Sequence, residues 1–147
     1  MTMNSLSQET SISGKSRDYS GNIKLDTYNY KEYLDALENL NQVKSIYIFY
    51  MGTESSSSGY SWCPLCSEVE QILDKRFADL SDSVLIKAHV GVQDEWENKT
   101  NHFKTDKELR LKVIPTFLKY KTPKRLEGQY CLKVELLNLI FEDECEY

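Results

Sequence analysis

The hydrophobic residues of this chain follow two spacings, one typical of buried strands and one typical of amphipathic helices. Residues 43–51 are dense in β-branched and aromatic side chains, which predicts a strand buried on both faces of a sheet. A serine- and glycine-rich loop follows at 52–61. Beyond Cys66, apolar residues recur on one helical face at Val69, Ile72, Leu73, Phe77 and Leu80. The pattern predicts a central strand, a loop and an amphipathic helix, in that order.

The other segments complete a mixed sheet. Strands are predicted at 23–28, 83–90, 113–118 and 125–130, helices at 30–41, 102–111 and 134–141, and a solvated acidic loop around Asp94 and Glu95. Pro115 stands near a strand start, where its missing N–H does no harm. A turn at 121–124 makes the last two strands an antiparallel hairpin. This order predicts an α/β fold, with a mixed central β-sheet flanked by helices on both faces.

One domain accounts for most of the chain. Residues 1–21 are rich in serine and poor in large apolar side chains, so burial cannot offset their ordering entropy, and we expect a disordered tail. Residues 22–143 form the predicted domain, and residues 144–147 are a C-terminal extension. No second hydrophobic core fits in 147 residues organised this way.

The segment Trp62-Cys63-Pro64-Leu65-Cys66 lies between the central strand and the amphipathic helix. Two cysteines three residues apart at a helix start form a typical redox-active dithiol, because free backbone amides and the helix dipole stabilise a thiolate on the first of them. We therefore interpret Cys63 as the nucleophile and Cys66, one turn deeper, as the resolving thiol. Pro64 suits the first helical turn and presents Cys63 outward.

Two other interpretations of this cysteine pair are weaker. A zinc site would need a second close pair of ligands, whereas Cys131, Cys145, His89 and His102 each stand alone in the sequence, so no metal is expected. A purely structural disulfide is disfavoured because four cysteines in 147 residues do not make a disulfide scaffold.

The composition of the chain limits which classes of partner and which cellular compartment are expected. The net charge of −5, with lysines dispersed among acids, offers no basic stripe for phosphates, so nucleic acid is not an expected partner. The first residues carry no apolar signal region, and no apolar run is long enough to cross a bilayer. We expect a cytoplasmic protein with no membrane partner.

Several short motifs occur in one order along the chain: Phe49-Tyr50-Met51-Gly52, Ser61-Trp62-Cys63-Pro64, Val90-Gly91, Val113-Ile114-Pro115-Thr116, Leu118-Lys119-Tyr120, Thr122-Pro123 and Cys131-Leu132. This order resembles thioredoxin-like proteins and, more narrowly, the thioredoxin domain-containing protein 17 family, over about residues 23–142. The resemblance implies a thioredoxin-like fold and a disulfide reductase that contributes to cell redox homeostasis. It also implies small or selected substrates such as cystine, no bound cofactor, and electrons from NADPH through a thioredoxin-reductase-type enzyme.

The resemblance also implies roles for residues around the dithiol. Pro115 would form a cis peptide and lie against the dithiol, leaving the Ile114 backbone free to pair with substrate beside Thr116. Independently of the resemblance, Trp62 is expected to pack beside the dithiol and shield it because it adjoins Cys63, and Tyr60 and Lys87 are expected to line the site.

Two departures from the family pattern stand out. Leu65 replaces the usual Asp, which removes a charge near both thiols and offers an exposed apolar contact. Residues 43–51 contain no acid, so the resolving thiol would pass its proton through water or Glu68.

Two other functions stay open at this point. The chain could be a thioredoxin-fold adaptor that binds a partner with little turnover, or a thiol-dependent peroxidase in which Cys63 forms a sulfenic acid that Cys66 resolves. Cys131 and Cys145 are interpreted as plain thiols, and the protein as a monomer.

Overall fold

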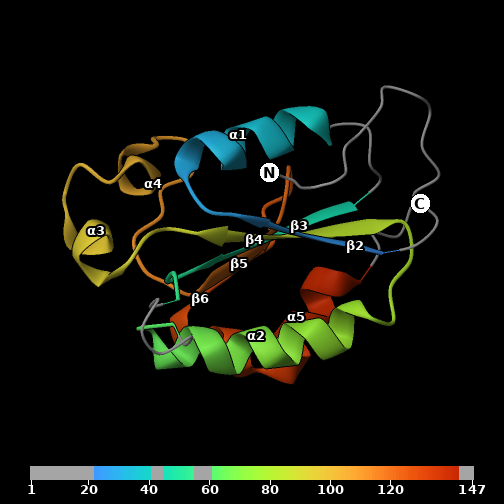
Figure 1. Ribbon diagram of the computed structural model, residues 1–147. Coiled ribbons are helices and arrows are strands. Elements are labelled where there is room, and N and C mark those ends of the chain that lie inside the picture. Colours follow the sequence, from blue (N-terminus) through green and yellow to red (C-terminus); the bar gives the residue numbers. More distant parts are fainter. Residues whose placement is uncertain (1–21, 41–44, 55–60, 143–147) are drawn as a thin grey trace.

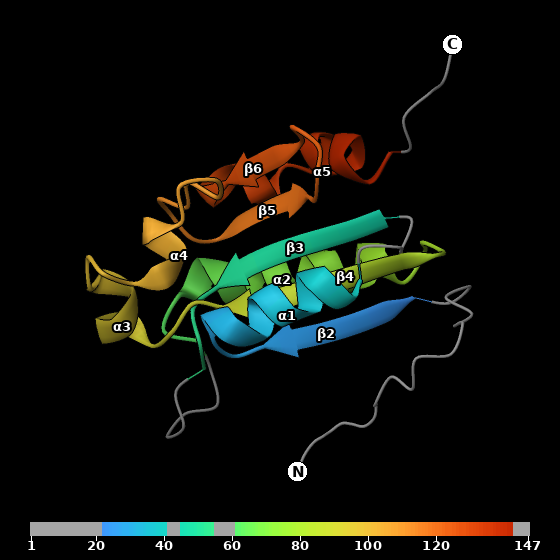
Figure 2. The same cartoon turned by 90° about the horizontal axis from the view of Figure 1, so that it is seen from above.

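The computed structural model describes residues 22–40, 45–54 and 61–142. Within them, five strands form one sheet in the order β2-β4-β3-β5-β6 (Figure 2). Their bounds are β2 Ile23–Thr27, β4 Ser83–His89, β3 Ser45–Met51, β5 Thr116–Lys119 and β6 Arg125–Glu127. β4 pairs in parallel with both β2 and β3, whereas β5 pairs antiparallel with both β3 and β6. The predicted mixed sheet and its terminal hairpin are confirmed.

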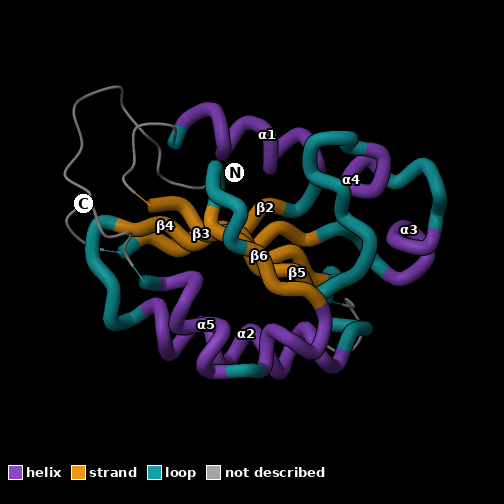
Figure 3. The backbone as a smooth tube through the Cα atoms, turned by 180° about the vertical axis from the view of Figure 1, so that it is seen from behind, coloured by secondary structure: helices purple, strands orange, loops and turns teal. Residues whose placement is uncertain are grey.

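Helices cover both faces of the sheet. Helix α1 (Tyr30–Asn39) lies on one face, and α2 (Pro64–Phe77) and α5 (Val134–Phe141) lie on the other (Figures 1 and 3). The short helices α3 (Gln93–Glu97) and α4 (His102–Thr105) lie beyond the carboxyl ends of β2 and β3 (Figure 2). A 3₁₀ helix, η1 (Gly128–Leu132), leads from β6 to α5.

Strand β3 divides the hydrophobic core in two. All seven of its residues are buried, because it has strands on both edges and helices on both faces. Successive side chains of a strand point to opposite faces. Ile46, Ile48 and Tyr50 therefore join the core under α1, whereas Tyr47, Phe49 and Met51 join the core under α2 and α5. The prediction of a central strand buried on both faces is confirmed.

The sequence-based prediction was wrong for the region that follows β4. The predicted acidic loop contains α3, because Trp96 is buried and Asp94 and Glu95 lie in the first helical turn, where the helix dipole favours acids.

The helix predicted at 102–111 ends at Thr105. The side-chain oxygen Oδ1 of Asp106 accepts from the backbone N–H groups of Glu108 and Leu109, at 3.0 and 3.1 Å. That local bonding replaces the next helical turn.

Other boundaries differ by a few residues. The strand predicted to reach residue 130 ends at Glu127, because Gly128, at a φ of 60°, turns the chain into η1. Helix α1 ends at Asn39, α2 ends at Phe77 rather than near residue 80, and β5 begins at Thr116, directly after Pro115. The predicted tail and extension, together with Tyr60 and Cys145, lie outside the described residues.

Candidate redox site

The dithiol forms the first turn of α2. Cys63 is the N-cap residue, with an extended backbone, and Pro64 occupies the first helical position. The backbone N–H of Cys66 donates to Cys63 Sγ at 3.2 Å. The sulfur therefore satisfies one of the amides that a helix start leaves unpaired. Cys63 and Cys66 form a disulfide, with their Cα atoms 5.2 Å apart.

The two sulfurs differ in their access to solvent. Cys66 is fully buried, whereas 8% of the surface of Cys63 is exposed to solvent. Cys63 is therefore the more accessible of the two, although most of its surface is also buried. Pro64 is exposed. Leu65, which the sequence suggested as an exposed apolar contact, is half-buried and packs against the core under α2.

Trp62, next to the dithiol, contacts the segments that follow the carboxyl ends of β3 and β4. Its indole Nε1–H donates to the carbonyl oxygen of Gly91, just beyond β4, at 2.9 Å. The ring lies against Gly52, where an added Cβ would come within 2.7 Å of Trp62 Cε2. The half-buried ring packs against both core clusters, one of which contains the two cysteines.

Two neighbouring residues, Ser61 and Thr53, complete this attachment, and the sequence analysis gave neither of them a role. Ser61 Oγ donates to the Gly52 carbonyl at 2.8 Å and accepts from the Cys63 N–H at 3.1 Å. Thr53 exchanges bonds with Gly91: its N–H donates to the Gly91 carbonyl at 3.0 Å, and its Oγ1 accepts from the Gly91 N–H at 2.9 Å. The Gly52 and Gly91 positions were quoted only as motif letters, although a glycine after each strand is a signal of close approach.

The Ile114–Pro115 segment reaches the same end of the sheet. Its peptide bond is cis, as the resemblance implied. The antiparallel pairing of Tyr50 with Thr116 brings the start of β5 to the end of β3 that leads to the dithiol. Ile114 is half-buried and packs against the core cluster that contains both cysteines. Thr116 is fully buried, and its hydroxyl donates to the Val113 carbonyl at 2.8 Å.

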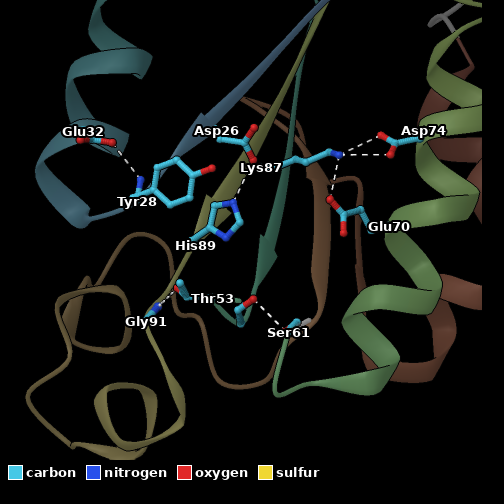
Figure 4. Close-up of polar contacts among 11 residues, drawn as sticks. Asp26, Tyr28, Glu32, Thr53, Ser61, Glu70, Asp74, Lys87, His89 and Gly91 are labelled. Carbon is cyan, nitrogen blue, oxygen red and sulfur yellow. Dashed lines mark hydrogen bonds and ion pairs between the residues drawn. The ribbon is translucent and has the colours of Figure 1, made fainter. Parts of the chain in front are cut away.

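A charged network lies between α2 and β4 (Figure 4). Lys87 Nζ lies 2.8 Å from Glu70 Oε2 and 3.0 Å from Asp74 Oδ1, and Lys24 also pairs with Asp74, at 3.1 Å. The Lys87 side chain is 11% exposed. Burial alone would lower the pKa of Lys87, but the hydrogen bonds and the negative charges of Glu70 and Asp74 together outweigh burial and raise that pKa.

Glu70 rather than Glu68 faces the sheet. Glu70 follows Cys66 by four residues and is half-buried against Lys87, whereas Glu68 is exposed. Residues four apart are neighbours on a helix surface. A second polar pair, His89 Nε2 with Asp26 Oδ1 at 2.9 Å, lies beside this network on the same strands (Figure 4).

Cys131 is a free, fully buried thiol in η1. Burial raises its pKa to about 12. Such a thiol carries almost no thiolate at neutral pH, in agreement with its interpretation as a plain thiol.

No group of three or more histidine, cysteine or acidic side chains that could hold a metal ion occurs in residues 22–40, 45–54 and 61–142. None of the helices described has the length and apolar character required to cross a bilayer.

A mixed sheet between two helical layers, with a Cys-x-x-Cys pair at the start of the helix after the central strand, defines a thioredoxin-like protein and supports thiol–disulfide oxidoreductase chemistry. Solved structures agree on the fold. Thioredoxin O1 from Arabidopsis thaliana in its oxidised state matches 81% of this chain and 98% of its own at a TM-score of 0.51 and 15% identity. A redox protein from Chlamydomonas reinhardtii matches 89% of this chain and 39% of its own at a TM-score of 0.56 and 18% identity.

The chain belongs to the thioredoxin domain-containing protein 17-like family, whose thioredoxin-domain model matches residues 26–143. Thioredoxin domain-containing protein 17 from Epinephelus coioides is 34% identical over 116 residues, which are 78% of this chain and 91% of the relative. The human protein of the same name is 31% identical over the same shares. The family resemblance drawn from the motifs is confirmed.

Proposed function

We propose that this protein reduces small or selected disulfides, with Cys63 as the nucleophile and Cys66 as the resolving thiol. The observation that carries the proposal is the Cys63 sulfur at the N-cap of α2, where it accepts the Cys66 N–H. An amide donor and the positive end of a helix both stabilise a thiolate more than a thiol.

The reaction begins from the reduced dithiol. The Cys63 thiolate attacks one sulfur of the substrate, forming a mixed disulfide and releasing the other substrate sulfur as a thiolate. The Cys66 thiolate then attacks Cys63 Sγ and displaces the second substrate thiolate. The substrate gains two electrons and, after protonation, becomes two thiols, while Cys63 and Cys66 end in the disulfide that the structure contains.

The limited exposure of Cys63 supports compact substrates. With only 8% of its surface accessible, Cys63 is more readily reached by a small disulfide such as cystine than by one in a broad protein surface. The half-buried Ile114, near the dithiol at the start of β5, would offer its backbone to the substrate.

Glu70 is our candidate acceptor for the Cys66 proton. Cys66 must lose that proton before it can attack the mixed disulfide, and it is fully buried. The Glu70 side chain starts about 5–6 Å away along the helix surface, as expected for residues four apart. Its carboxylate is held by Lys87. Glu70 therefore takes the role that the sequence analysis gave to water or Glu68, either directly or through one water molecule.

Each turnover leaves the dithiol oxidised and requires two electrons from elsewhere. We infer a thioredoxin-reductase-type enzyme that draws on NADPH as their source, a cytoplasmic setting, and a monomeric protein with no bound cofactor. Membership of the family and the chemistry of the dithiol support these inferences.

The test couples NADPH oxidation, through a thioredoxin-reductase-type enzyme, to reduction of cystine and of insulin. We expect cystine to be reduced faster than insulin, and both rates to fall to background in Cys63→Ser. In parallel, the pH dependence of Cys63 alkylation in the reduced protein should give a pKa well below the free-thiol value of ~8.5. Alkylation like that of a free thiol, with neither substrate reduced, would contradict the proposal and leave the adaptor function.

A further inference from the structure

A pocket on the α1 face of the sheet lies apart from the dithiol. It has a volume of about 400 Å³ and is lined from α1, β3, β5, β6 and the segments before and after β5. Small-molecule sites typically occupy about 300–1,000 Å³ and combine an apolar lining with a few polar groups. Its apolar lining comes from Leu34, Leu37, Leu109, Leu118 and Pro123.

Two buried tyrosines supply its central polar group. Tyr33 from α1 and Tyr50 from β3 both line the pocket, and their exposures are 4% and 0%. Their hydroxyl oxygens lie 2.6 Å apart, so one hydroxyl donates to the other. Two hydroxyls carry two protons, and this bond uses one of them. Among the described residues, the second O–H has no acceptor.

A buried O–H is stabilised by an acceptor, and a ligand carbonyl in the pocket would supply one. Burial also raises the pKa of both tyrosines. The free group is therefore a neutral O–H that offers a proton and carries no charge.

The charged groups around the pocket are mostly engaged within the protein. Asp106 accepts from the Tyr30 hydroxyl at 2.7 Å, and Arg125 donates to the carbonyls of Leu109 and Arg110 at 2.7 and 2.9 Å. Lys121 and Glu108 lie exposed at the rim and carry opposite charges. The lining therefore gives neither sign of ligand charge a clear advantage.

We propose that this pocket is a second binding site, which takes a small neutral molecule with an apolar or aromatic body and one carbonyl-type acceptor directed at the Tyr33–Tyr50 hydroxyl pair. The site lies on the sheet face opposite α2, so it is independent of the dithiol. Binding should be unchanged in Cys63→Ser.

The test uses two probes of similar shape, acetophenone, which carries a carbonyl, and ethylbenzene, which does not. Each is titrated into the full-length, ¹⁵N-labelled protein and followed by two-dimensional amide NMR. We expect saturable shifts at amides around the pocket, such as those of Leu109 and Tyr120. In the double variant Tyr33→Phe, Tyr50→Phe, acetophenone affinity should fall about 3- to 10-fold relative to ethylbenzene, the range expected for loss of one net hydrogen bond.

A second variant keeps the test decisive if the double variant does not fold. Leu34 is 43% exposed at the pocket rim, and Leu139, on α5, is 54% exposed outside it. Leu34→Trp should weaken both probes, and the matched control Leu139→Trp should not. No saturable shift up to the solubility of either probe, shifts that map elsewhere, or equal loss of both probes in the double variant would overturn the proposal.

Discussion

Trp62 and Gly52 show how single residues set the position of the dithiol. The indole bonds to Gly91 and occupies the space that any side chain at Gly52 would need. Neither contact follows from hydrophobic spacing, because the partners lie far apart in sequence. The sequence did predict Cys63, Pro64 and Cys66 in their observed places, because a helix start imposes local rules on residue type.

We expect Gly52→Ala to displace Trp62 and to lower the free energy of unfolding by about 1–3 kcal/mol, the usual cost of overpacking. Urea unfolding of the oxidised protein measures the change. In a Trp62→Ala background the same substitution should cost much less, because the clashing ring is gone. Equal costs in the two backgrounds would show that the clash is not the cause.

The cysteines should differ sharply in reactivity. In the reduced, folded protein at pH 8, iodoacetamide should modify Cys63, whereas Cys131 should stay unmodified, because burial raises its pKa to about 12. Peptide mass spectrometry distinguishes the two sites. After unfolding in urea, Cys131 should react at the rate of an ordinary thiol; rapid modification in the folded state would contradict its burial.

At the scale of elements, long helices and strands could be predicted from the sequence, whereas short ones could not. Strand β3 and helix α2 have enough apolar residues at one period to define them. Helix α4 has only four residues, and its end depends on one Asp106 side chain. The contact between α2 and β4 through Glu70 and Lys87 also could not be predicted from the sequence, because the two residues are 17 positions apart and lie in different elements.

The contact between α2 and β4 gives a test of proton transfer. Glu70→Gln should slow resolution of the mixed disulfide on the order of 10²-fold at neutral pH, the low end for loss of a general base. Single-turnover trapping of the mixed disulfide measures this step. The loss should shrink at high pH, where Cys66 ionises without help.

Glu68→Gln is the matched control, because Glu68 is exposed on the same helix. It should leave the rate unchanged. Equal rates for Glu70→Gln and the native protein at every pH would remove Glu70 from the mechanism, without affecting the roles of the two cysteines.

At the scale of the whole molecule, tyrosines in and around the α1 core make the free energy of unfolding depend on pH. Desolvation and a hydrogen bond to Asp106 raise the pKa of the half-buried Tyr30 to about 12. Burial raises the pKa values of Tyr33 and Tyr50, whereas an unfolded tyrosine titrates near ~10. Above pH 10 the unfolded chain therefore holds fewer protons than the folded one. Stability must fall as pH rises through this range.

We expect the free energy of unfolding to fall above pH 10 by up to about 1.4 kcal/mol per pH unit for each tyrosine that stays protonated. Urea unfolding at several pH values between 9 and 11.5 measures the slope. The slope should be shallower in Tyr33→Phe, Tyr50→Phe, if that variant folds. An unchanged slope would show that these hydroxyls ionise freely in the folded protein.

The alternation of side chains along β3 has a consequence for how this chain can diverge. Residues 47, 49 and 51 serve the layer that carries the dithiol, and residues 46, 48 and 50 serve the layer that carries the tyrosine pocket. Substitutions can therefore alter one layer and spare the other. Inserting or deleting one residue in β3 would instead exchange the two sets of side chains. During evolution, the residues of β3 can therefore be substituted separately for each layer, but the length of the strand must stay the same.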